Sequence, residues 1–135
     1  MSDYTSQATR PSVGTPVAAV LGATAAAIAI WAVATMANAE LTVSYAPAPP
    51  TKITVVNVVV AALVGSLAGW GLLALLRRFT AKARTVWTVT AIVAALLSLG
   101  GPLSATASAG TKMSLVAMHL AVATVLIVVL RRTLR

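Results

Sequence analysis

The chain contains no cysteine, and only two of its 135 residues are acidic. Without cysteine there can be no disulfides, thiolate metal sites, lipoprotein acylation or cysteine nucleophiles. The two acids are Asp3 and Glu40, and neither lies within a long apolar segment. Proton-coupled pumps and small exporters need a carboxylate inside the membrane, so the sequence argues against both classes.

Charge of either sign is also scarce. Charged residues make up 9% of the chain and apolar residues 59%, whereas a soluble domain averages about 25% charged residues. A surface with so little charge must be covered by lipid, so the bilayer is the expected partner. The formal net charge of +8 comes from basic residues that flank apolar segments. No basic face with interleaved aromatics is present, and nucleic acid is therefore not an expected partner.

Long apolar segments dominate what is present. At about 1.5 Å per residue, each is long enough to cross, or nearly cross, a hydrocarbon core of about 30 Å. Residues 1–15 are polar and aperiodic, which predicts a disordered cytoplasmic tail. The remainder, residues 16–135, is predicted to form one transmembrane domain whose spans are 16–37, 53–76, 86–103 and 113–130.

The second span is the clearest guide to the membrane topology because it ends abruptly in a basic cluster. The basic residues predicted to set the topology are Arg77, Arg78, Lys82, Arg84, Arg131 and Arg132. With Arg10 and Arg135 they lie on one side of the predicted topology, against Lys52 and Lys112 on the other. The positive-inside rule then places both termini in the cytoplasm. The loops are short, so sequential helices should be antiparallel neighbours. We therefore expect an all-α, up-and-down four-helix transmembrane bundle in the plasma membrane.

The first span has a second interpretation. Ala37, Asn38 and Ala39 form an A-x-A pattern like a signal-peptidase site. However, the apolar run before it exceeds the roughly 7 to 15 residues of a signal peptide's apolar region. Arg10 is also the only base preceding it. We expect a retained helix, with cleavage after Ala39 as the alternative.

Residues that interrupt the apolar segments locate the connections between the predicted spans. Pro47, Pro49 and Pro50 favour extended backbone in the segment 38–52, which cannot be helical there. Just before them, residues 41–45 alternate apolar and polar side chains and predict a short strand-like piece. Near the end of the third span, Pro102 and the two glycines before it predict a stop or kink.

Small residues suggest helix contacts. Gly65 and Gly69 form a GxxxG pair in the second span, with Gly71 close by. The first span carries further small-residue rows, Gly22 with Ala26 and Ala19 with Ala23 and Ala27. The leading functional interpretation is a non-enzymatic assembly module or accessory subunit that packs through these glycines, either with its own copies or with another membrane protein.

Polar residues of the spans suggest a pocket. His119 is the only ionisable group inside a span, and such a group is a candidate site because charge is costly in lipid. Asn57, Ser98, Thr35 and Asn38 are predicted to lie near its depth, in the outer half of the bundle. The alternative function is therefore a ligand-binding or permeation protein with an outward-facing pocket around His119. A neutral histidine that simply joins helices by hydrogen bonds is the structural alternative.

Neither a metal site nor catalysis is predicted. Met36, Met113 and Met118 lie near His119 in depth, but methionine is common packing material in spans. No cofactor is expected. There is no serine–histidine–acid set, H-E-x-x-H or phosphate loop, and Glu40 with His119 is the only conceivable acid–base pair. We therefore expect a protein that is not an enzyme.

Three motifs carry a resemblance over nearly the whole chain after residue 14. They are the basic loop LLRRFTAKARTVW (75–87), SLGGPLSA (98–105) and the histidine in MHLAVA (118–123). With the alanine- and valine-rich composition, they make the chain resemble a family of small four-span actinobacterial membrane proteins of unknown function. The resemblance implies an integral protein of the plasma membrane, and it implies no activity.

Overall fold

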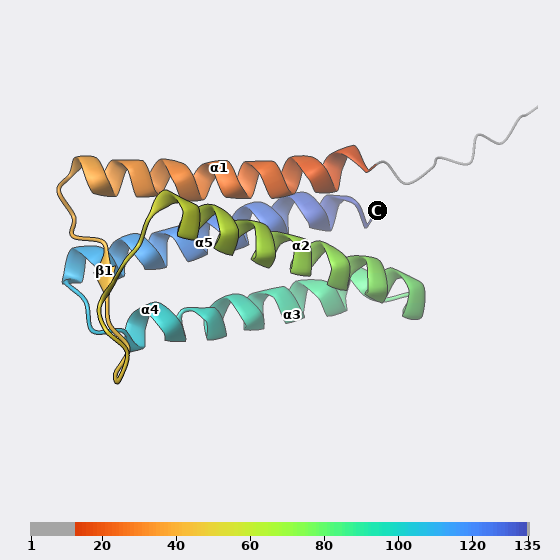
Figure 1. Ribbon diagram of the computed structural model, residues 1–135. Coiled ribbons are helices and arrows are strands. Elements are labelled where there is room, and N and C mark those ends of the chain that lie inside the picture. Colours follow the sequence, from red (N-terminus) through yellow and green to blue (C-terminus); the bar gives the residue numbers. More distant parts are fainter. Residues whose placement is uncertain (1–12, 135) are drawn as a thin grey trace, which may run out of the picture.

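The computed structural model describes residues 13–134 of the chain. Within this range, four helical segments are long and apolar enough to cross a membrane. They lie side by side and alternate in direction along the chain (Figure 1). In chain order the elements are α1 (Gly14–Met36), β1 (Thr42–Val43), β2 (Thr51–Lys52), α2 (Val55–Phe79), α3 (Ala83–Ser98), α4 (Gly100–Ser104) and α5 (Ala109–Arg132). The all-α, four-helix fold class expected from the sequence is confirmed.

The two ends of the bundle differ in chemistry. At one end, β1 and β2 form a hairpin between α1 and α2, and we call this the hairpin end. At the other end, the segment 77–84 and the last turn of α5 carry most of the basic residues, and we call this the basic end. Arg77 and Arg78 lie in the last turn of α2, and Arg131 and Arg132 in the last turn of α5. Cations in that position interact favourably with the helix dipole.

Helix α1 begins at Gly14, inside the segment predicted to be a tail. Pro16 is its third residue, and a proline is tolerated there because the first N–H groups of a helix have no partner within it. The other residues of that prediction, 1–12, lie outside the described part of the chain. Helix α1 therefore exceeds the predicted span by two residues at its start.

Helix α1 ends in a left-handed turn at Asn38, whose φ is 56°. The N–H of Asn38 donates to the carbonyl of Thr35 at 3.1 Å, and the N–H of Ala39 donates to that of Ala34 at 3.0 Å. This pair of bonds is the Schellman motif, which satisfies carbonyls that the helix leaves free. Asparagine suits it because its short polar side chain tolerates the left-handed conformation.

Small residues bring α1 close to its neighbours, which are chiefly α5 and α2. Ala19, Ala23 and Ala27 occupy successive turns of one face, and all three are buried. Gly22 also lies against α5, where an added Cβ would be 3.6 Å from Val125 Cγ1. In a membrane such rows favour helix association because they let backbones pack closely.

Proline divides the third span. Helix α3 ends at Ser98, four residues before Pro102, and α4 continues from Gly100. Proline has no N–H to donate to the carbonyl four residues earlier, and its ring collides with that carbonyl. Pro102 is itself buried at the hairpin end.

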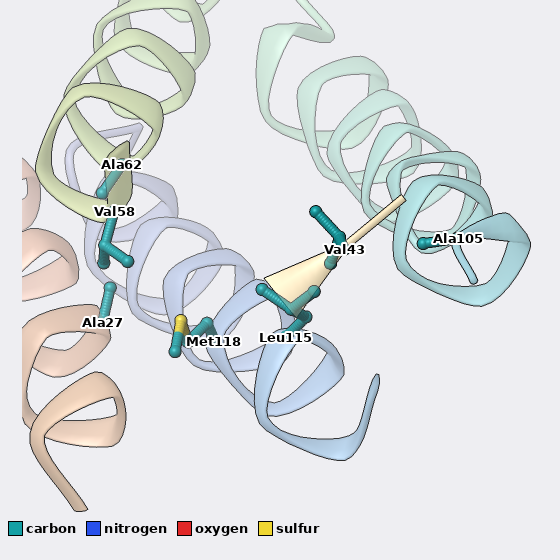
Figure 2. Packing of buried hydrophobic residues seen from close by; sticks show 7 residues of the cluster. All are labelled: Ala27, Val43, Val58, Ala62, Ala105, Leu115 and Met118. Atoms are coloured by element: carbon teal, nitrogen blue, oxygen red, sulfur yellow. The ribbon is translucent and has the colours of Figure 1, made fainter. Parts of the chain in front are cut away.

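The hairpin closes its end of the bundle. Thr42 pairs with Lys52 and Val43 with Thr51 in antiparallel register. Ser44 makes a further bridge to Thr106, between α4 and α5. Val43 is buried, and Figure 2 shows it on β1 directed into the bundle near Leu115 of α5.

Two clusters of buried apolar side chains form the core. The cluster of the hairpin half includes Val43, Ala27 and Met118, and that of the basic half includes Trp87 and Leu130. Figure 2 shows the first cluster, where α1, α2 and α5 approach each other. Helix α1 is the most buried of the spanning segments, whereas the segment formed by α3 and α4 is the least buried. This difference leaves room beside α3.

Candidate functional site: a groove between α2, α3 and α5

A cavity of about 670 Å³ lies between α2, α3 and α5. One face of each helix lines it: α2 between Asn57 and Leu72, α3 between Trp87 and Ser98, and α5 between Leu115 and Ile127. At the hairpin end, Val43 and Pro102 complete the lining. The volume falls in the range of about 300 to 1,000 Å³ that is usual for ligand pockets.

The cavity is a groove that opens sideways. Its floor is buried and includes Val58 and Leu126. Its walls are exposed, with Ala61 and Gly65 on α2 and Ala94 on α3. In Figure 1, α2 and α3 diverge from the basic end toward the hairpin end. In a bilayer, this opening between α2 and α3 faces lipid.

Trp87 closes the groove toward the basic end. Its side chain is 1% exposed, and its Nε1–H donates to the carbonyl oxygen of Gly69 at 3.1 Å. This bond ties the start of α3 to α2 at the point from which the two helices diverge. A buried tryptophan N–H needs such a partner.

His119 lines the groove from α5 and is half-buried. Its Nδ1 lies 2.8 Å from the carbonyl oxygen of Leu115, one turn earlier in the same helix. A carbonyl oxygen can only accept, so Nδ1 carries the proton, and in the neutral ring Nε2 is an acceptor. The hydrogen bonds formed within residues 13–134 leave Nε2 without a partner.

Asn57 lines the groove while it also caps α2. Its Oδ1 accepts from the backbone N–H of Thr54 at 2.9 Å and from the Thr54 hydroxyl at 2.7 Å. The Thr54 hydroxyl in turn accepts from the Asn57 backbone N–H, which completes a capping box. The side-chain amide N–H groups of Asn57 have no hydrogen-bond partner in the described part of the chain.

Two other polar side chains of the lining, those of Ser98 and Tyr45, donate to backbone carbonyls. Ser98 Oγ donates to the carbonyl of Ala95 at 2.7 Å, and the Tyr45 hydroxyl donates to that of Gly101 at 3.2 Å. Each of these oxygens therefore keeps acceptor capacity. Thr90 lines the groove eight residues before Ser98, a spacing that puts both on one face of α3.

The structure brings together His119, Asn57 and Ser98 of the predicted pocket, but not Thr35 or Asn38. The Thr35 hydroxyl donates to the carbonyls of Trp31 and Ala32, and Asn38 forms the turn that ends α1. Depth along the bundle was the only guide to these residues, and depth does not tell toward which neighbour a side chain points.

Sequence reasoning missed Tyr45 and Thr90 as lining residues. The spacing of Thr90 from Ser98 was a usable signal, since residues eight apart share a helix face. No comparable signal existed for Tyr45, because its position depends on how the hairpin folds over the bundle.

The glycines of the GxxxG pair lie on the groove wall. An added Cβ at Gly65 would meet nothing within 4 Å, and at Gly69 it would lie 4.0 Å from Leu126 Cδ1. An added Cβ at Gly71 would also meet nothing within 4 Å, and this glycine is outside the lining. No helix of the described chain packs closely on Gly65 or Gly71, whereas Gly69 lies at the contact with Trp87 of α3.

The lining carries no lysine, arginine, aspartate or glutamate within the described residues. Lys82 and Arg84, like the arginines of the helix ends, are exposed at the basic end and outside the groove. Met118 lines the groove, whereas Met36 and Met113 are 83% and 73% exposed and lie outside it. The residues from 13 to 134 hold no cluster of three histidine or acidic side chains that would suit a metal.

These features define a small multi-pass membrane protein with a laterally open, uncharged groove. The chain belongs to the family of unknown function DUF6069, whose model matches residues 7–135. No curated protein and no solved structure matches the chain.

Proposed function

We propose that the protein is a non-enzymatic plasma-membrane protein that binds one elongated apolar molecule in the groove. Both termini are proposed to lie in the cytoplasm because the basic residues gather at one end of the bundle. The close packing of α1 supports a retained first span over one cleaved after Ala39. The alanine-rich composition suggests an actinobacterial source.

The observation that carries the proposal is the uncharged groove of about 670 Å³ that opens toward lipid. From Asn57 to Leu72 the α2 wall is about 22 Å long at the usual helical rise. This length exceeds half of a hydrocarbon core of about 30 Å, which suits an extended chain better than a compact ligand. An apolar molecule can enter sideways without leaving the bilayer.

The chemistry of the lining favours binding over catalysis. His119 is the one imidazole of the lining, and no carboxylate of the described chain lines the groove beside it. General acid–base catalysis at two positions, or activation of a nucleophile, needs a second group within hydrogen-bond reach.

A second candidate function is assembly through the glycine face of α2. Gly65 lies in open space and is flanked on the same wall by Ala61 and Ala68, which are exposed. Such a row would let a helix from a second copy or another membrane protein approach closely. The two functions predict different responses to the same substitution.

The test compares Gly65→Leu with Gly71→Leu in the full-length protein, purified in a mild detergent. Both glycines belong to α2 and have open space at Cβ, but only Gly65 lines the groove. Mass spectrometry of the organic extract measures lipophilic molecules retained per chain, and native mass spectrometry gives the oligomeric state. The matched control removes any general effect of adding a leucine to α2.

We expect the wild type and Gly71→Leu to retain a near-stoichiometric lipophile, and Gly65→Leu to retain about tenfold less. Equal retention in all three proteins would overturn groove binding. If Gly65→Leu instead converts an oligomer to a monomer without changing retention, the assembly function is supported.

A further inference from the structure

Polar atoms are distributed unevenly along the groove. Asn57, Ser98 and Tyr45 line it toward the hairpin end. His119 follows Met118, which belongs to the cluster of the hairpin half. In the basic half, the lining is apolar apart from Thr90. A ligand that matches this gradient has one polar end, which lies in the hairpin half, and an apolar chain directed toward Trp87.

The polar end must be uncharged. No lysine or arginine of the described residues lines the groove to pair with a phosphate or carboxylate. No aspartate or glutamate among them lines it to pair with an ammonium group either. An unpaired charge in an apolar site is costly, so ligands with ionised headgroups are disfavoured.

The free hydrogen-bonding atoms of the lining indicate which uncharged group the ligand carries at its polar end. His119 Nε2 can accept because Nδ1 already donates to the Leu115 carbonyl. Ser98 Oγ retains acceptor capacity, and the Asn57 amide offers N–H donors. A hydroxyl suits Nε2 of His119 because it can donate a hydrogen bond, and its oxygen can still accept one from another donor. A ketone, ether or ester can only accept and leaves the imidazole nitrogen unsatisfied.

We infer that the groove selects a long-chain lipidic alcohol, whose hydroxyl donates a hydrogen bond to Nε2 of His119. The inference rests on the proposed groove binding and names its ligand class. It makes His119 the residue that recognises the polar end, and the walls of α2 and α3 the surface that holds the chain. In an apolar groove, loss of this bond leaves Nε2 without a partner, which costs free energy.

The test uses a set of probes that differ only at one end. Hexadecane carrying a mid-chain diazirine photolabels the full-length protein in phosphatidylcholine nanodiscs, and peptide mapping locates the label. Hexadecanol, its methyl ether, hexadecyl phosphate and unlabelled hexadecane then compete with the photolabel. The ether keeps the oxygen but cannot donate, so it isolates the hydrogen bond to His119.

For the wild type we expect hexadecanol to compete about tenfold more strongly than its methyl ether, as one hydrogen bond in an apolar site allows. The phosphate should compete no better than the ether. In His119→Phe, which keeps a ring of similar shape, the alcohol and the ether should be equal, while labelling by the alkyl probe persists. Probe partitioning into lipid is the same for both proteins and cancels from the comparison.

The outcomes distinguish failure of groove binding from failure of the ligand class. If the alkyl probe does not label groove residues, the proposed function fails. If it labels them but the alcohol and ether compete equally in the wild type, groove binding stands and the alcohol inference is overturned. The alcohol inference is also overturned if hexadecyl phosphate is the strongest competitor. The concentration of each competitor in the nanodisc is measured, so the wild-type comparison decides these points even where His119→Phe does not fold.

Discussion

Asparagine has two different roles in this chain. Asn57 caps α2 through Oδ1 and also lines the groove. Asn38 instead adopts a φ of 56° and ends α1. Both asparagines were predicted to line the pocket. At the residue scale, the left-handed backbone of Asn38 distinguishes it from Asn57.

Asn38 offers a direct test of the turn that ends α1. Left-handed backbone costs an ordinary L-residue about 1 to 2 kcal/mol, and glycine pays no such penalty. We expect Asn38→Ala to lower the free energy of unfolding by about 1 kcal/mol, and Asn38→Gly to leave it nearly unchanged. Thermal unfolding of the two variants in one detergent measures the difference. Equal stabilities would show that the turn does not depend on the left-handed residue.

Individual site residues were partly predictable. A polar side chain in an apolar span is rare, and this rarity identified His119, Asn57 and Ser98, all of which line the groove. Thr35 and Ser98 each donate the hydroxyl to a carbonyl three residues earlier in the chain, yet only Ser98 lines the groove. Composition does not distinguish a residue like Thr35 from a residue that faces a cavity.

At the scale of elements, apolar runs located the helices but not their ends. Helix α2 continues through Arg77 and Arg78 to Phe79, because long basic side chains reach the interface from a helix that is still intact. The α2–α3 connection is therefore only residues 80–82, where a longer basic loop was predicted. The break before Pro102 was predictable, since it follows from the covalent structure of proline.

The contact of α1 with its neighbours can be tested on two alanines of the same helix. Ala23 is fully buried, whereas Ala25 is exposed on another face. Ala23→Leu inserts extra volume into a close-packed face, so we expect a loss of about 1 to 3 kcal/mol of stability. Ala25→Leu should change stability by less than about 0.5 kcal/mol, because it only adds apolar surface toward lipid. Detergent-dependent unfolding midpoints of both variants provide the measurement, and equal midpoints would contradict the packing described for α1.

At the scale of the whole molecule, the groove exists because α2 and α3 diverge from their contact at Gly69 and Trp87. The tilt of one helix against another depends on the packing of every side chain between them, so no sequence pattern indicated a lateral opening. The GxxxG pair illustrates this limit. Its small residues line the cavity within this chain, and their predicted packing against a helix of another chain stays a prediction.

The orientation of the bundle decides which leaflet supplies the polar end of a ligand. If the basic end is cytoplasmic, the hairpin end and the polar half of the groove face outward. Because the chain has no cysteine of its own, the orientation of the bundle can be measured by single-cysteine labelling. Ala48 lies in the hairpin and Ala81 in the α2–α3 connection, and both are exposed at opposite ends of the bundle.

We expect a membrane-impermeant maleimide to label Ala48→Cys in intact cells, and Ala81→Cys only after permeabilisation. The reason is that four basic residues near Ala81 resist translocation across the membrane, whereas the hairpin has only Lys52. The reverse pattern would place the polar half of the groove in the cytoplasmic leaflet, where a ligand would enter from inside. Labelling of both positions in intact cells would instead contradict a single orientation and remove the basis for assigning the groove to either leaflet.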